Sequence, residues 1–140
     1  MTNAYKIGGC VVDTATSIVT LTAPVVNTDR YQVLQAPFGT SYAVPANKKL
    51  VVTKVVVNGG ASSWTCGFGY ATNANTNATS GAVTAWVELI YYRNLKQLTS
   101  GVTYEYDVYF EIPTGKYPHV HGGDVSTDMY VGAYGVLVDA

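Results

Sequence analysis

The chain has 140 residues, 48% of them hydrophobic and 12% charged, and 8 basic residues against 9 acidic ones leave a net charge of −1. This length corresponds to a single domain, residues 1–140, that buries roughly two thirds of the surface its unfolded chain exposes, so neither a disulfide nor a metal is needed to explain folding. A nearly neutral chain has no broad positive field. Nucleic acid is therefore not an expected partner.

The composition predicts a weakly ionic surface, because charged residues fall well below the roughly one quarter that is usual. A surface of this kind suits a subunit whose faces lie against neighbouring proteins, since charge is depleted at the cores of protein interfaces. A tyrosine-rich β protein without such a role explains the composition equally well, because threonine and tyrosine favour strands.

No export or membrane signal is expected. The first ten residues, MTNAYKIGGC, lack a charged region followed by an apolar core, and no run approaches the roughly 18 apolar residues of a membrane span. We expect a protein that is made in the cytoplasm and stays soluble, with no membrane partner. Cys10 and Cys66 lie in separate predicted strands without metal-ligand spacing, so free buried thiols are expected, with one disulfide as the alternative.

The first third of the chain predicts short strands. Residues 4–12 are interrupted by two glycines and predict an edge strand, or an arm formed by residues 1–12. Residues 17–22, SIVTLT, alternate as a half-buried strand does. Residues 23–30 contain proline, asparagine and aspartate and predict a loop, after which residues 31–36 predict another strand.

Residues 42–58, YAVPANKKLVVTKVVVN, predict a hairpin around which the remaining strands are arranged. A first strand leads to a Pro-Ala-Asn-Lys turn, and a long second strand follows. Residues 50–57 are the most apolar and β-branched run of the chain. We therefore expect this strand near the middle of a sheet, with cover on both faces.

Residues 64–71, WTCGFGYA, predict the next strand, in which Gly67 and Gly69 share one face. Two glycines on one face indicate close approach by another backbone or by a large side chain. Residues 72–81, TNANTNATSG, contain no apolar residue larger than alanine. They predict an exposed loop.

The remainder of the chain predicts four more strands. Residues 82–98 fit both helical and strand periodicity, and their β-branched and aromatic content favours a strand as far as Tyr92, then an irregular connection. Residues 102–112 alternate cleanly, and strands at 117–121 and 129–138 follow. Eight or nine strands separated by turn residues predict an all-β protein, a two-sheet antiparallel β-sandwich. Jelly-roll topology is favoured over an immunoglobulin-like or other Greek-key arrangement.

Two segments, residues 42–52 and 110–120, repeat one local pattern of an apolar residue, proline, any residue, asparagine or glycine, and lysine. In each, proline ends the incoming strand and lysine starts the return strand. Asparagine and glycine tolerate positive φ, so two equivalent hairpin turns are predicted.

Three carboxylates, Glu105, Asp107 and Glu111, lie on one face of the predicted strand 102–112, the first two about 7 Å apart. A pair at this separation can act in glycoside hydrolysis or bind a hard cation. A solvated strand face is the favoured interpretation, because nothing in the sequence indicates an apolar pocket that would separate their pKa values.

His119 and His121 alternate across one residue, so their rings share a face, and Asp124 follows closely. Such a trio is a candidate Zn²⁺ site. Two ligands on one strand beside a glycine turn are also common by chance, and we therefore expect no metal. No catalytic serine, cysteine, phosphate-loop or zinc-protease motif is present, so neither an enzyme nor a cofactor is expected.

Aromatic residues supply the interface candidates. Tryptophan and tyrosine anchor protein interfaces, but they also stack on sugar rings and fill cores. Core packing accounts for most of them here, and subunit contacts are preferred over carbohydrate for the remainder. The candidates are Trp64, Trp86, Tyr91, Tyr92 and Tyr109.

With both proline turns located, the chain resembles the small jelly-roll proteins that tailed bacteriophages place on their virions, especially head decoration (cement) proteins and head-fibre modules. The resemblance is carried by YAVPANKKLVVTKV, by WTCGFGYAT and by FEIPTGKYPHV. It implies a non-enzymatic homotrimer on the capsid surface of the virion, bound to the major capsid protein and stabilising the head. The alternative is a carbohydrate-binding module, a lectin or a receptor-binding fibre domain, whose partner is a glycan.

Overall fold

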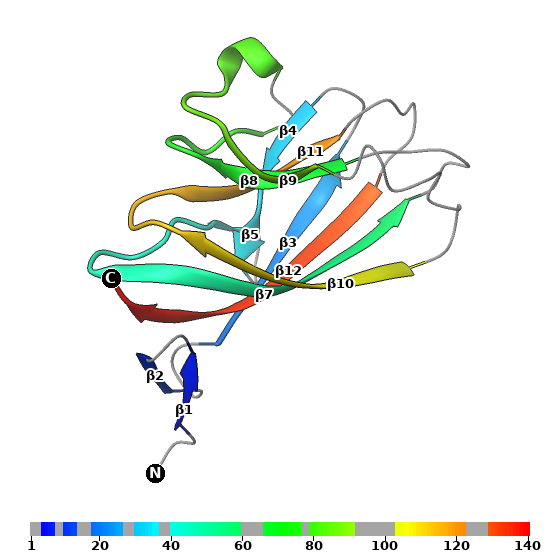
Figure 1. Cartoon of the computed structure of the whole chain (residues 1–140). Helices are drawn as coiled ribbons and strands as arrows, with labels where there is room; N and C mark the ends of the chain where they lie inside the picture. The colour runs from blue at the N-terminus through cyan, green and yellow to red at the C-terminus, as the bar shows by residue number, and fades with distance from the viewer. Residues whose placement is uncertain are drawn as a thin grey trace.

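The computed structural model describes residues 4–7, 10–13, 18–26, 30–36, 40–59, 66–76, 79–91, 103–122 and 129–140. These ranges form antiparallel strands and one short 3-10 helix, η1 (Ser80–Ala82). Two sheets stack face to face (Figure 1). Within the same ranges, no helix has the length and apolar character needed to cross a membrane.

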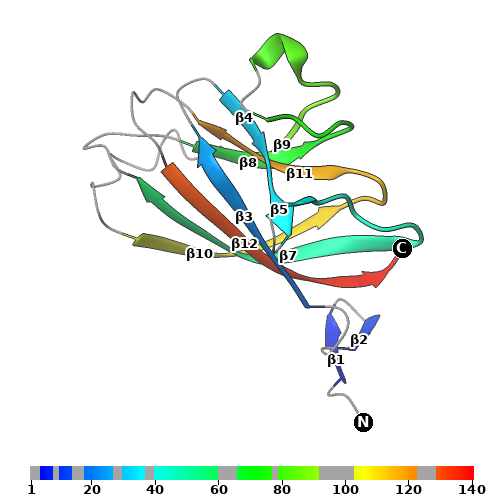
Figure 2. The same ribbon diagram turned by 180° about the vertical axis from the view of Figure 1, so that it is seen from behind.

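The two sheets differ in size. The larger has six strands in the order β10 (Thr103–Ile112), β7 (Lys48–Gly59), β12 (Met129–Asp139), β3 (Ile18–Val26), β5 (Gln35–Ala36) and β6 (Thr40–Ser41). The smaller has four, in the order β4 (Arg30–Val33), β11 (Tyr117–Gly122), β8 (Cys66–Ala71) and β9 (Val87–Tyr91). The view from behind shows the same two layers (Figure 2).

The wiring of these strands is that of a jelly roll, as the sequence predicts. In chain order, β3, β7, β10 and β12 belong to the larger sheet, and β4, β8, β9 and β11 to the smaller one. The chain therefore crosses between sheets at every connection of this set except β8 to β9. The resulting strand orders, 10-7-12-3 and 4-11-8-9, are those of two interleaved Greek keys.

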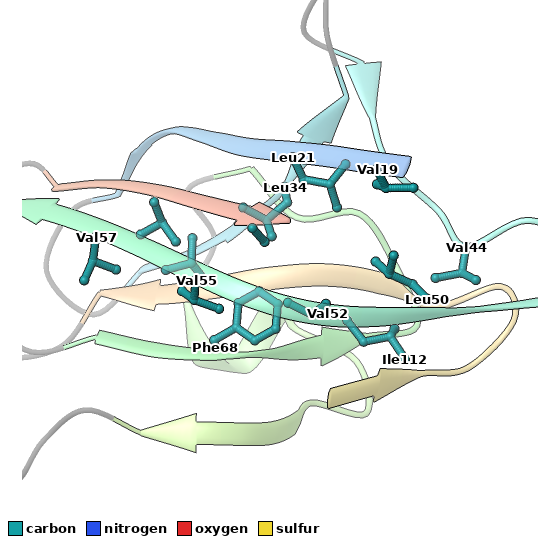
Figure 3. Close-up of a cluster of buried hydrophobic side chains, with 13 residues drawn as sticks. Val19, Leu21, Leu34, Val44, Leu50, Val52, Val55, Val57, Phe68 and Ile112 are labelled. Atoms are coloured by element: carbon teal, nitrogen blue, oxygen red, sulfur yellow. The ribbon is translucent and has the colours of Figure 1, made fainter. Parts of the chain in front are cut away.

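The space between the sheets is filled by aliphatic side chains (Figure 3). Leu50, Val52, Val55 and Val57 of β7 all point inward and are at most 1% exposed. Alternation holds on each side of Thr53, where the register with both neighbouring strands shifts. The smaller sheet contributes Phe68, whose ring lies 6.0 Å from that of a phenylalanine on β10. Full burial of such side chains stabilises the fold by about 2 kcal/mol each.

Strand β7 occupies the position predicted for residues 50–57. It pairs with β10 on one side and β12 on the other. Its outward Val51 is fully buried in a second cluster with Val136 and Val138 of β12, so this part of the strand is covered on both faces. In the middle of the strand, Thr53 and Lys54 both face outward and are open to solvent.

The first arm of the predicted hairpin is not a strand. Residues 42–45 form no ladder with β7. The backbone of Val44 instead pairs with the second proline turn: its N–H donates to Lys116 O (2.9 Å), and its O accepts from Gly115 N–H (2.9 Å). This long-range pairing replaces the local one, so the hairpin prediction is wrong for this arm.

The two proline turns have the positive φ predicted for them, but neither closes a hairpin, because residues 42–45 form no ladder with β7 and because β10 and β11 (Tyr117–Gly122) belong to different sheets. Asn47 has φ 61° and Gly115 has φ 75°, and in each turn the lysine N–H donates to the carbonyl of the proline three residues earlier (3.2 Å). One positive φ at the third position defines a type II turn. The turns also dock on each other, because the Thr114 hydroxyl donates to the carbonyl of Lys48.

Two expectations near the N-terminus need correction. Strand β3 does not stop before Pro24 but continues to Val26. Opposite this proline the register with β12 shifts by one residue, and a bulge accommodates the missing N–H donor. Residues 31–36 are two strands, because the chain changes sheets at Leu34, which is fully buried between β4 and β5.

Residues at the N-terminus form a hairpin outside both sheets, made of β1 (Ala4–Ile7) and β2 (Cys10–Asp13). Strand β2 lies beside β12, below the larger sheet in the view of Figure 1. The expected arm is therefore a two-stranded unit. Cys10 lies in β2 and Cys66 begins β8, in separate strands as predicted.

Candidate functional site

Two outward surfaces bring the sequence candidates together, and the first is the outer face of the smaller sheet. Paired residues in neighbouring strands share a face. His119 of β11 is paired with Val33 of β4 and Gly69 of β8, and His121 is paired with Tyr31 and a further glycine. The two histidines therefore share a face, as predicted, and it is the face turned away from the core.

His119 is fully buried although it points away from the core. Its Nε2 accepts a hydrogen bond from the backbone N–H of Asn75 (3.2 Å) and lies 3.0 Å from the side-chain amide nitrogen of the same residue. A backbone N–H can only donate, so Nε2 carries no proton. Nδ1 therefore carries the proton and donates to Tyr117 O (2.7 Å). Burial lowers the pKa of this imidazole, and the bond to Tyr117 O opposes that shift.

The segment that buries His119 is the cap loop, the described part of residues 72–86, seen above β4 and β8 in Figure 1. Asn75 is 5% exposed, and its carbonyl accepts a hydrogen bond from Val33 N–H (2.7 Å). The Asn73 carboxamide oxygen accepts from Thr84 N–H (3.1 Å), which joins the two ends of the loop. The prediction of an exposed loop is therefore wrong at Asn75, although most of its neighbours are exposed.

Trp86 anchors the far end of the cap loop. A Cβ atom at Gly69 would lie 2.8 Å from the indole and 2.1 Å from the Val87 carbonyl oxygen, so only glycine fits beneath this tryptophan. The close approach predicted from the strand glycines is confirmed at this position. The indole also meets the Tyr31 ring edge-on at 5.0 Å, and Tyr31 stacks on His121 at 4.2 Å.

Strand β9 begins only at Val87, later than predicted. Residues 80–82 form η1, and Ala85 has φ 51°. A positive φ at a residue with a Cβ is uncommon and interrupts an extended chain. The predicted strand through residues 82–92 is therefore wrong in its first half.

His119 has no ring nitrogen left for the metal ion that the histidine spacing allows. Both ring nitrogens of His119 are engaged in internal hydrogen bonds, and His121 stacks on Tyr31. Across the described ranges, no three His, Cys, Asp or Glu side chains gather closely enough to hold an ion. Asp124 lies outside the described residues.

The second surface is the outer face of the larger sheet, where the predicted carboxylates point to solvent. Glu111 accepts a 2.9 Å hydrogen bond from Lys49, which lowers the pKa of the carboxyl group. Glu105 lies 3.8 Å from Lys54. Lysines on β7 therefore face the carboxylates of β10, and the favoured interpretation of a solvated strand face agrees with this arrangement.

Two tyrosines stand out on this face. Tyr109 is 54% exposed and donates a hydrogen bond to Glu111 (3.3 Å). Tyr134 of β12 is 41% exposed and borders an open depression of about 440 Å³. The floor and rim of this depression are formed by Thr53, Lys54, Val56, Glu105 and Tyr134.

The aromatic interface candidates separate in the structure. Tyr109 is exposed as expected, whereas Trp86 packs on the smaller sheet. Tyr91 ends β9, and Trp64 and Tyr92 lie outside the described residues. Sequence reasoning missed Tyr134, although alternation along residues 129–138 places it opposite the buried Ala133.

Comparison with protein-family models, with curated proteins and with solved structures found no match.

Proposed function

We propose that this protein is a non-enzymatic virion component, a decoration (cement) protein that binds the major capsid protein and stabilises a phage head. The jelly-roll wiring supports this proposal, because it is the fold that the resemblance to phage virion proteins implies. Fold alone does not determine function, whereas exposed side chains determine what the surface can bind.

The observation that carries the proposal is the setting of Tyr109. This tyrosine is more than half exposed, on β10 at one edge of the larger sheet. A hydrogen bond to Glu111 holds its hydroxyl, and Lys49 neutralises that carboxylate. An exposed aromatic side chain that is already ordered loses little conformational entropy on binding, and tyrosine is enriched among residues that dominate interface energies.

The chemistry of the described side chains supports a binding role over catalysis. The buried imidazole of His119 is neutral and holds the cap loop, and Glu111 is paired with a lysine. A structural role needs neither group to react. Many copies on a symmetric shell gain avidity from weak individual contacts, and binding to the assembled shell raises its stability by mass action.

The experiment adds purified protein to phage heads that lack it, from the virus that encodes the chain. We expect saturable binding, a trimer by sedimentation analysis, and a higher temperature of head disruption. Tyr109→Ala is expected to weaken head binding by about tenfold or more, as loss of an anchor side chain does. Tyr134→Leu serves as the matched control on the same face.

Absence of the protein from virions, or head binding that Tyr109→Ala leaves unchanged while the variant folds normally, would show that the proposed role or surface is wrong. If the protein binds heads as a monomer, the proposed role stands and the proposed trimer is wrong.

A further inference from the structure

The depression beside Tyr134 lies across three neighbouring strands of the larger sheet, and its shape limits what it can bind. Its volume of about 440 Å³ lies toward the small end of ligand sites. It is open to solvent on one side, because Tyr134 and Glu105 on its rim are both exposed. A flat, hydrated small molecule fits such a surface better than an apolar ligand that needs enclosure.

Tyr134 supplies an aromatic platform. A Cβ atom at Gly132 would lie 3.6 Å from Cε2 of the tyrosine and 3.7 Å from its hydroxyl, so the ring reaches back along β12 over the position where a side chain is missing. The Tyr134 carbonyl oxygen accepts a hydrogen bond from the Thr53 hydroxyl (3.3 Å). The ring therefore lies over the sheet at a point where the strand is tied to β7.

Lys54 and Glu105 provide a donor and an acceptor beside this ring. Their charged atoms are 3.8 Å apart, beyond hydrogen-bond distance, whereas the ion pairs of Lys48 with Asp139 and of Lys49 with Glu111 close to 2.6 and 2.9 Å. The ammonium and carboxylate at the depression can therefore each bond to a ligand placed between them.

Charge restricts the ligand further. Asp107 is paired with Lys54 in the ladder and is also exposed on this face, so one cation faces two carboxylates. This balance repels phosphate and acidic sugars. A neutral ring meets the conditions set by the tyrosine, the ion pair and the charge balance. Its apolar face can stack on Tyr134, and its hydroxyl groups can bond to Lys54 and Glu105.

The geometry points to a subsite for a neutral hexopyranose at Tyr134, with its ring stacked on the tyrosine and its hydroxyl groups bonded to Lys54 and Glu105. A ligand of about twelve heavy atoms at this exposed position binds with millimolar affinity. The subsite is independent of the virion role, because it uses Tyr134 in place of Tyr109.

The test titrates the ¹⁵N-labelled protein with methyl glycosides of glucose, galactose and mannose and maps the shifted amide signals. We expect at least one glycoside to bind at millimolar concentration, with shifts centred on Thr53, Lys54 and Tyr134. Tyr134→Leu and Glu105→Ala are expected to weaken binding by about tenfold or more, and Tyr109→Ala to leave it unchanged.

No binding of any neutral glycoside, or shifts that map elsewhere on the wild-type protein, would overturn the subsite. Binding restricted to acidic sugars would overturn it as well. Because the wild-type map does not need a variant to fold, it decides the matter by itself. Loss of head binding in Tyr109→Ala with sugar binding intact separates this subsite from the proposed capsid contact.

Discussion

Acidification from about pH 7.5 to about pH 5 is expected to destabilise the fold through His119. The buried imidazole is neutral, and its Nε2 must accept the hydrogen bond from Asn75. A proton on Nε2 would face that N–H donor, and a backbone donor cannot turn away. Protonation therefore breaks the contact that holds the cap loop on the smaller sheet.

The direction and size of the effect follow from proton linkage. Burial lowers the pKa of His119 in the folded state below its ordinary value of 6.5. Above pH 6.5 both folded and unfolded states are neutral, so stability does not change with pH. Below it the unfolded chain binds the proton first, and stability falls by up to about 1.4 kcal/mol per pH unit while the folded imidazole stays neutral. Between pH 6.5 and 5 the free energy of unfolding therefore falls by at most about 2 kcal/mol.

Urea unfolding followed by fluorescence at a series of pH values measures this slope. His119→Gln removes the titrating group, and His121→Gln is the matched control on the same face. We expect the slope to persist in His121→Gln and to vanish in His119→Gln. A wild-type stability that stays flat down to pH 5, or a slope that survives in His119→Gln, would refute the assignment.

Further substitutions test the packing and the turns by the same unfolding assay. Gly69→Ala is expected to lower the free energy of unfolding by about 3 kcal/mol, because its Cβ would overlap a carbonyl oxygen and an indole. In the control Gly81→Ala the new Cβ meets nothing within 4 Å, so stability should change by less than about 0.5 kcal/mol. Equal effects of the two substitutions would contradict the close packing at Gly69. Gly115→Ala should cost about 1 kcal/mol from its positive φ alone, and Asn47→Gly should be tolerated; the reverse order would refute the turn assignment. Tyr42→Phe should be neutral or stabilise by up to about 1 kcal/mol, because the buried Tyr42 hydroxyl has no hydrogen-bond partner within the described ranges and burial raises its pKa to about 12. A loss above about 1 kcal/mol would reveal a partner for that hydroxyl.

Local physics makes the faces of the strands readable from the sequence. In β10 the alternation of half-buried and exposed residues follows the predicted pattern from Thr103 to Glu111. The turn residues Asn47 and Gly115 were predictable for the same kind of reason, because positive φ is a property of one residue and its own Cβ. The number of strands and their connecting turns also favoured the jelly roll before any contact was known.

Tertiary structure decided which outward faces stay open. Alternation places His119 and Tyr31 away from the core, but it cannot indicate that the cap loop returns to bury them. That contact joins Asn75 to His119 across 44 positions of sequence, and Val44 reaches its backbone partner at Lys116 in the same way. Such pairings depend on how the two sheets bring distant segments together. Only the folded chain therefore shows that the cap loop covers the outer face of the smaller sheet, while Tyr109 and Tyr134 stay exposed on the larger one.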